Sequence, residues 1–369
     1  MRIGMMLRSL DEKGGIGVYT RYLTEELLNA DRRNEYVLYY RNPANQGRFA
    51  HLENVAERVL VAPNKALWDQ LYVPYACRKD RVDVLLHPKF TVPFLAHCKT
   101  VMVLHGAGWF MPNADEYWSS WDLRYINLFM PLYCRRATAI ISVSEITTEM
   151  FNDIFKLPPG KIRTVYFGPG KQFKRVEDEH TLRRVKSRYD LPDHFVLTLS
   201  KVGGGGRKNI EGILSAYEIH HGRTAHKLVV GGKDCDTFKT TYNLPDDGYG
   251  QDILFPGWID QEDLPAVYSL ADLYLYPSNV EAFPIPLTEA MACGTPIITS
   301  NLNGLKEIAG EAALFVDPAN PHQIAKAMGR VLTDGQLWET LASKALARSE
   351  LFSWERCARQ TLRILEGLS

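Results

Sequence analysis

The chain of 369 residues is 46% hydrophobic and 23% charged, as in an ordinary globular protein, and it has no low-complexity tract that would indicate disorder. This length exceeds what one hydrophobic core usually supports, so we expect two domains. Lys plus Arg and Asp plus Glu both number 43, and this balance gives no global support to nucleic-acid binding, which usually shows a basic excess.

Cysteine usage and the first residues bear on the cellular compartment. The six cysteines are scattered without the CxxC spacing of metal sites, and the start from Met1 to Leu7 lacks the long apolar core and cleavage site of a secretory leader. No window approaches the roughly 18 consecutive apolar residues that a membrane span needs. We therefore expect a cytoplasmic protein in a reducing setting.

Short apolar runs alternate with helical patterns along the chain, which is typical of βα units and a mainly parallel sheet. The first series predicts strands at 2–7, 35–40, 82–86, 100–104 and 139–142, and helices at 18–28, 123–136 and 145–155. The second predicts strands at 195–199, 227–230, 253–255, 273–276, 297–299 and 313–316, with helices between them. Three helical stretches close the chain, and the last runs over 354–368 after Ser353 as its N-cap.

A glycine and proline cluster from Phe167 to Gly170 separates the two series and suits an interdomain linker. We predict a first domain at residues 1–168 and a second at 169–352, with the final helix, 353–369, packing back on the first. Because both halves are built like nucleotide-binding folds, the natural site is a cleft between them.

Two carboxylates, Glu281 and Glu289, stand eight residues apart across a predicted strand-to-helix junction. In an open α/β sheet this is the edge where ligands bind, and carboxylates there suit sugar hydroxyls. Alternatively, both are solvated charges at a helix start, where acids are favoured. The motif alone leaves these two interpretations evenly balanced.

A second junction carries four consecutive glycines between Lys201 and Lys208, directly after a predicted strand. The glycines let the backbone approach a ligand closely, and the two lysines supply positive charge where a diphosphate would lie. The string matches neither the P-loop nor the GxGxxG pattern, so a flexible surface turn is the alternative.

Two features of the first domain also bear on the site. Gly15 and Gly17 open the first predicted helix and permit close approach of a phosphate, although a tight turn explains them equally well. His105 ends a predicted strand and faces the predicted cleft, but a lone histidine there is more often structural. His87 has the same placement with weaker support, and we assign it no role.

Together these residues resemble the retaining glycosyltransferases of family 4, which have the two-domain GT-B fold. The family's glutamate motif, E-G-F-G-x-P-x-x-E-A-M-A-x-G-x-P, is matched by Glu281 through Pro296, its basic pair by Lys201 and Lys208, and its N-terminal glycine loop by Gly14 to Gly17. The resemblance covers nearly the whole chain. Because the motifs occur together and in the family's order, we favour it over the interpretations of the single motifs as surface charges or turns. The resemblance implies an α/β fold of two Rossmann-like domains whose parallel sheets face a central cleft.

For the site, the resemblance implies a nucleotide-sugar donor held mainly by the second domain. Glu289 would bind the ribose hydroxyls and Glu281 the transferred sugar, while Lys201 and Lys208 would stabilise charge on the departing diphosphate. His105 would contact the donor sugar, and no protein nucleophile is required. The further donor-binding residues expected are Arg207, Gly203, Gly204, Phe283, Pro284, Ile285, Trp258, Gly15 and Gly17.

The chain departs from the family pattern at Ala282 and Pro284, where glycines are common, and Pro284 cannot donate a backbone N–H. The loop from Lys201 to Lys208 is also one residue longer than expected, so the pairing of each cation with an oxygen is open. No metal is expected. Asp234-Cys-Asp236 spells the DxD string of metal-dependent transferases of another fold, but it lacks their structural context.

The resemblance thus predicts a metal-independent transferase that moves a hexose, first of all mannose from GDP-mannose, to an oligosaccharide or lipid-linked acceptor in glycan biosynthesis. The region 109–136 is rich in aromatic and basic residues. We expect them to form helix core and the wall of the cleft on the acceptor side; alternatively, they form a surface that docks on the inner membrane face. The alternative functions are a catalytically silent GT-B protein that binds nucleotide or partners and a GT-B nucleotide-sugar epimerase. Retention of both glutamates and both lysines argues against the silent protein.

Overall fold

The computed structural model describes residues 1–12, 14–200, 206–233 and 237–368. The chain divides into two compact units, the first formed by 1–115, 119–167 and 353–369 and the second by 116–118 and 168–352. The division at Phe167 and Gly168 falls in the glycine and proline cluster. None of the helices in the described residues is long and apolar enough to cross a membrane.

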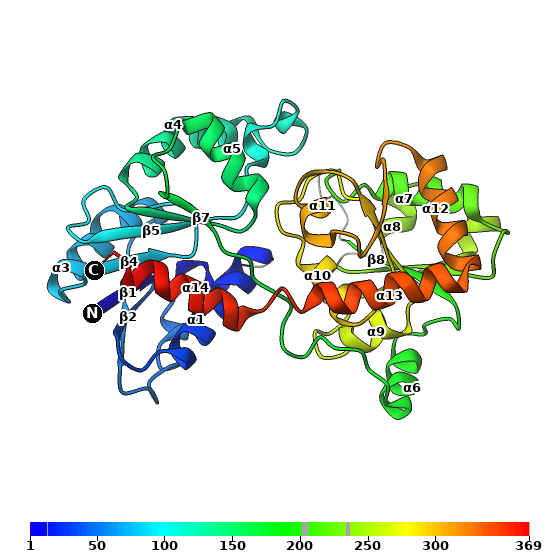
Figure 1. Ribbon diagram of the computed structural model, residues 1–369, viewed down its shortest axis with the longest axis horizontal. Coiled ribbons are helices and arrows are strands. Elements are labelled where there is room, and N and C mark those ends of the chain that lie inside the picture. Colours follow the sequence, from blue (N-terminus) through cyan, green and yellow to red (C-terminus); the bar gives the residue numbers. More distant parts are fainter. Residues whose placement is uncertain (13, 201–205, 234–236, 369) are drawn as a thin grey trace. The chain divides into compact units, whose positions relative to one another are not determined.

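The first unit is built on a seven-stranded parallel sheet with the order β3-β2-β1-β4-β5-β6-β7 (Figure 1). Its strands are β1 (Arg2–Met6), β2 (Glu35–Tyr40), β3 (Val55–Val59), β4 (Val84–His87), β5 (Lys99–Leu104), β6 (Ala139–Ser142) and β7 (Ile162–Thr164). Its helices are α1 (Gly15–Ala30), α2 (Lys65–Leu67), α3 (Val73–Lys79), α4 (Ser120–Arg136), α5 (Glu145–Phe155) and α14 (Trp354–Glu366). Nearly every residue of the inner strands is buried, as expected for a sheet with helices on both faces.

The C-terminal helix α14 packs against α1 in the first unit, and Figure 1 shows α14 in red beside it. The buried residues of α14 recur at a helical spacing, which gives it one apolar face. Trp354 stacks on Phe167 with ring centroids 4.7 Å apart and on Tyr22 at 5.2 Å. Ser353 caps the helix by accepting from the N–H of Arg356, as the sequence predicted.

The second unit has a six-stranded parallel sheet with the order β10-β9-β8-β11-β12-β13. Its strands are β8 (Phe195–Leu199), β9 (Lys227–Gly231), β10 (Ile253–Gly257), β11 (Leu273–Tyr276), β12 (Ile297–Ser300) and β13 (Leu314–Val316). Its helices are α6 (Glu179–Arg188), α7 (Ile210–His220), α8 (Phe238–Thr241), α9 (Leu264–Leu270), α10 (Ile285–Ala292), α11 (Asn303–Ala309), α12 (Pro321–Thr333) and α13 (Gly335–Ser349).

Both sheets therefore have the strand order of a doubly wound nucleotide-binding fold, and the predicted fold class of two parallel-sheet α/β domains is confirmed. In the second unit the order reverses between β8 and β11. At such a switch point the loops after two neighbouring strands run in opposite directions and leave a crevice at the carboxyl ends. The described residues 206–209 after β8 and the segment after β11 that carries Glu281 both lie at this switch point.

Candidate functional site

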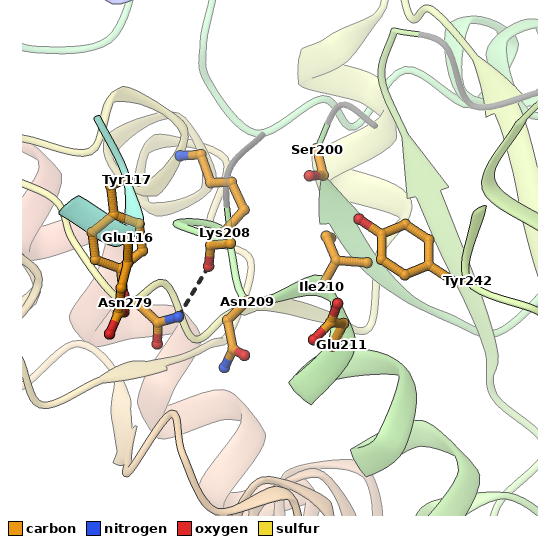
Figure 2. A pocket seen from close by; sticks show the side chains of 10 residues that line it. Glu116, Tyr117, Ser200, Lys208, Asn209, Ile210, Glu211, Tyr242 and Asn279 are labelled. Carbon is orange, nitrogen blue, oxygen red and sulfur yellow. Dashed lines mark hydrogen bonds between the residues drawn. The ribbon is translucent and has the colours of Figure 1, made fainter. Parts of the chain in front are cut away.

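Hydrogen bonds join the loop after β8 to the loop after β11. The carbonyl of Arg207 accepts from the hydroxyl of Ser278 at 2.6 Å and from the N–H of Asn279 at 2.8 Å. The side-chain amide of Asn279 donates to the carbonyl of Gly206 at 3.0 Å (Figure 2). Asn209, which precedes α7 in a left-handed conformation, donates to the carbonyl of Pro277 at 3.1 Å. These hydrogen bonds therefore fix the positions of the two loops relative to each other at the switch point.

This arrangement of the two loops brings Lys208 and Glu281 into contact. Nζ of Lys208 lies 2.5 Å from Oε1 of Glu281, and the two side chains are 28% and 18% exposed. The hydroxyl of Tyr276, the last residue of β11, donates to the same oxygen at 2.9 Å and also contacts Nζ of Lys208. The ammonium lies 4.4 Å from the centre of the Tyr276 ring, a cation–π distance.

The charge of Glu281 is stabilised by these neighbours. Burial raises the pKa of its carboxyl, but Lys208, the Tyr276 hydroxyl and the more distant Arg207 outweigh burial, and the net pKa lies below the ordinary value. Glu281 is therefore ionised at neutral pH and can accept hydrogen bonds from hydroxyl groups. The alternative that it is a solvated surface charge is wrong, because its side chain is largely enclosed.

Glu289 lies in the second turn of α10 and is only 7% exposed, so it too is not a solvated charge. Burial raises the pKa of its carboxyl to about 7, although the hydroxyl of Tyr268 donates to Oε2 at 3.2 Å. A row of tyrosine rings connects it to the first glutamate: the ring centres of Tyr268 and Tyr274 are 5.3 Å apart, and those of Tyr274 and Tyr276 are 5.6 Å apart. The two carboxylates thus stand at the ends of one aromatic layer with different protonation behaviour.

A pocket of about 370 Å³ lies at the start of α7 in the second unit (Figure 2). It is lined by Lys208 and by the first residues of α7, and also by Tyr242 and by Tyr117, which belongs to this unit. The guanidinium of Arg207 stacks over the ring of Trp118 at 5.8 Å. The helix start offers N–H groups to an anion and Lys208 lies beside it, while the carboxylates of Glu116 and Glu211 also line the pocket.

Of the remaining residues predicted to bind the donor in the second domain, those that the structure describes lie outside the contact between Lys208 and Glu281. Phe283 is buried and packs edge-on against Phe352 at 5.7 Å, while Pro284 is the N-cap of α10 and Ile285 is its first residue. Trp258 is 61% exposed and follows β10, which lies two strands from β8 in the sheet. Lys201, Gly203 and Gly204, together with the Asp234 and Asp236 string, lie outside the described residues.

In the first unit, Gly17 has a packing role. A Cβ at this position would lie 1.8 Å from the carbonyl oxygen of Glu12, so the start of α1 requires glycine there. Gly15 is the first residue of α1 and follows Gly14, whose φ of 114° is a glycine conformation. The glycine run therefore serves the turn into α1, which was the alternative interpretation, and a role in ligand binding stays a prediction.

His105 follows β5 and is packed edge-on against Tyr19 with ring centres 4.7 Å apart. Its Nε2 lies 2.9 Å from the carbonyl oxygen of Pro88; since a carbonyl only accepts, Nε2 carries the proton and donates. Burial lowers the pKa of His105 to about 4, so the ring is neutral and its Nδ1 is left as an acceptor. Nδ1 of His105 can therefore accept a hydrogen bond from a hydroxyl group.

Sequence reasoning missed an ion-pair network beside this histidine. Lys89 contacts Glu12 at 2.5 Å, and Arg8 binds Asp69 at 2.7 Å with both side chains 7% exposed. Lys89 follows β4 by two residues, and this position at a strand end was the signal that could have identified it. No local pattern pairs Arg8 with Asp69, since 61 residues separate them.

Two family models match separate parts of the chain. The model described as glycosyltransferase family 4 matches residues 13–168, and that described as glycosyl transferases group 1 matches residues 187–348. The chain is 28% identical to the O-antigen chain mannosyltransferase B of Escherichia coli over 289 residues, 77% of this chain and 74% of that protein. It is also 28% identical to the Escherichia coli serotype-specific mannosyltransferase WbdA over 70% of this chain, but this covers only 32% of that longer protein.

Solved structures resemble the whole chain in fold. Sucrose-phosphate synthase from Thermosynechococcus elongatus aligns with a TM-score of 0.76 and 22% identity, over 100% of this chain and 98% of that one. Anabaena HepE in complex with UDP-glucose aligns with a TM-score of 0.75 and 18% identity over 100% of both chains. At such identities the likeness concerns the fold alone.

Proposed function

Because the chain belongs to the GT-B glycosyltransferases of the family 4 type, we propose that it transfers a hexose from a nucleotide diphosphate sugar, with retention of anomeric configuration, to an oligosaccharide or lipid-linked acceptor. The proposed donor is GDP-mannose, which is supported by the similarity to two Escherichia coli mannosyltransferases. HepE was solved with UDP-glucose, so a uridine donor is the competing choice that experiment must separate.

The observation that carries the proposal is the contact between Lys208 and Glu281 at the switch point of the second unit. A lysine beside the start of α7 would stabilise the negative charge that develops on a departing diphosphate, and fixed charges of this kind lower reaction barriers by several kcal/mol, about 2.7–4 for one donor. An ionised carboxylate next to that lysine would accept hydrogen bonds from the hydroxyls of the transferred sugar. The two charges are placed before the donor binds, so little reorganisation is needed.

Glu289 is proposed to bind the ribose. Vicinal hydroxyls can both donate to one carboxylate, and the enclosed position of Glu289 would make each of these bonds stronger than in water. His105 is proposed to accept from a hydroxyl of the donor sugar through Nδ1, because Nε2 is committed to the carbonyl of Pro88. No side chain is proposed as a nucleophile, and no metal is proposed to take part in the transfer.

The test is a thermal-shift titration of the full chain with GDP, UDP and dTDP and with their sugar derivatives. A ligand at one hundred times its Kd should stabilise the protein by about 2.7 kcal/mol. GDP and GDP-mannose are expected to give the largest shifts. If no nucleotide stabilises the protein, the donor site is wrong; if nucleotides bind but no acceptor is glycosylated, a silent protein or an epimerase is supported. The anomeric configuration of the product, read by NMR, tests retention.

A further inference from the structure

A second set of polar residues lies at the opposite edge of the six-stranded sheet, where its strands begin. His194, His226 and Asp272 directly precede β8, β9 and β11. In the sheet these strands are neighbours in the order β9-β8-β11, although β10 comes between them in the chain. The three side chains are brought together only by the strand order.

The distances within this group suit a shared cation. Nδ1 of His194 lies 3.4 Å and Nε2 of His226 lies 3.5 Å from the same oxygen, Oδ2 of Asp272. Hydrogen bonds from nitrogen to oxygen usually measure about 2.7–3.2 Å, so both contacts are long for hydrogen bonds. Ligand atoms bound at 2.0–2.1 Å to a tetrahedral zinc ion are separated by about 3.3 Å. One ligand atom from each of the three residues lies within 4.8 Å of the others.

Asp272 is held in place by its own backbone and by neighbouring groups. Its Oδ2 accepts from the N–H of Phe195 at 3.0 Å, and its carbonyl oxygen accepts from Nε1 of Trp338 at 2.7 Å. A ligand that is already oriented loses less entropy when an ion binds.

The two histidines complement this carboxylate. Nε2 of His226 faces the carboxylate of Asp272, while its Nδ1 is buried and has no hydrogen-bond partner within the described part of the chain. The His194 side chain is 61% exposed, which leaves the group open to ions from solvent.

We propose that His194, His226 and Asp272 form a binding site for a divalent transition-metal ion such as Zn²⁺. Two imidazole nitrogens and one carboxylate are ligands that zinc accepts, and three protein ligands leave the fourth position to water. The site lies where β8 begins, whereas Lys208 and Glu281 follow the ends of β8 and β11, so the ion would take no direct part in the transfer reaction. By joining three strands it would stabilise the second unit.

The experiment uses the full chain after treatment with EDTA and dialysis. Calorimetric titration with ZnCl₂ should show one ion per chain, and thermal unfolding should move to higher temperature when Zn²⁺ is added. Replacement of Zn²⁺ by Co²⁺ should give the visible absorption of a four-coordinate site. His194→Ala, at an exposed position that is safe for folding, and His226→Ala should each weaken binding by about tenfold or more.

His221→Ala is the matched control, because His221 lies near the same edge but pairs with Asp252 at 3.0 Å. It should bind Zn²⁺ as the unchanged chain does. Absence of saturable binding to the unchanged chain, an unaltered affinity in His194→Ala, or an equal loss in His221→Ala would each overturn the assignment.

Discussion

The ammonium of Lys208 and the carboxylate of Glu281 form an ion pair of 2.5 Å across 73 residues of sequence, and the hydroxyl of Tyr276 bonds to the same carboxylate oxygen. The pair is partly enclosed, so each charge depends on the other for stabilisation. Its position at the switch point gives it two consequences that can be separated experimentally, one for folding stability and one for the proposed reaction.

Lys208→Ala should lower both stability and rate. Removal of the cation leaves the enclosed carboxylate without its counterion, and we expect a loss on the order of 2 kcal/mol, less than for a fully buried pair. Transfer, or hydrolysis of the donor where no acceptor is known, should slow by about a hundredfold or more because charge on the diphosphate is no longer stabilised. Urea unfolding and initial rates at saturating donor measure the two effects.

The control for this substitution is Lys344→Ala. Lys344 pairs with Glu311 at 3.0 Å in the same unit, but its side chain is 46% exposed and that of Glu311 is 89% exposed. Exposed pairs contribute about 0–1 kcal/mol, so this variant should remain close to the unchanged chain in stability and in rate. Equal effects of the two substitutions would contradict the special role of Lys208.

Two tyrosines of β11 offer a matched pair of substitutions to phenylalanine. The hydroxyl of Tyr276 donates to the ionised Glu281, so Tyr276→Phe should cost about 1.5–3 kcal/mol of stability. The hydroxyl of Tyr274 is buried and makes no hydrogen bond of ordinary geometry within the described residues, so Tyr274→Phe should be neutral or slightly stabilising. Chemical unfolding of both variants measures the difference; a larger loss in Tyr274→Phe would contradict this account of the layer.

The fold was largely predictable because most strands are continuous buried apolar runs separated by helical periodicity. The strands that were missed are at the edges of the first sheet: β3 has the sequence Val-Ala-Glu-Arg-Val and is mostly half-buried, and β7 has only three residues. Such strands lack the long apolar run that the prediction relied on.

The candidate site was predictable where its residues follow the end of a strand. Lys208 and Glu281 could be placed at one sheet edge because parallel strands end together. Tyr276 could not be singled out, because a tyrosine in an apolar strand has the same pattern whether it packs in the core or bonds to a carboxylate. The group of His194, His226 and Asp272 was also missed, since each is a single residue before a strand and only the strand order makes them neighbours.

Glu289 should make stability depend on pH. Burial raises its pKa to about 7 in the folded protein from an ordinary value of 4.5, so the folded state binds the proton more tightly than the unfolded state. The free energy of unfolding should therefore fall by about 3 kcal/mol for this group as pH rises from about 4.5 to about 7. Above that pH it should stay at the lower value. Glu289→Gln removes the titration. Urea unfolding at pH 5 and pH 8 should show the variant gaining stability relative to the unchanged chain at the higher pH; a constant difference would contradict the raised pKa.

Gly17→Ala should destabilise the first unit. The added methyl would lie 1.8 Å from the carbonyl oxygen of Glu12, so the turn into α1 must shift, and overpacking of this kind costs about 1–3 kcal/mol. Gly335→Ala is the control: Gly335 is the first residue of α13, and a methyl there would have no atom within 4 Å. That variant should be neutral or gain about 0.4–1 kcal/mol through the reduced freedom of the unfolded chain. Thermal unfolding of both variants measures the contrast. If Gly17→Ala is as stable as Gly335→Ala, the glycine is not required by packing and its role must be sought in ligand binding.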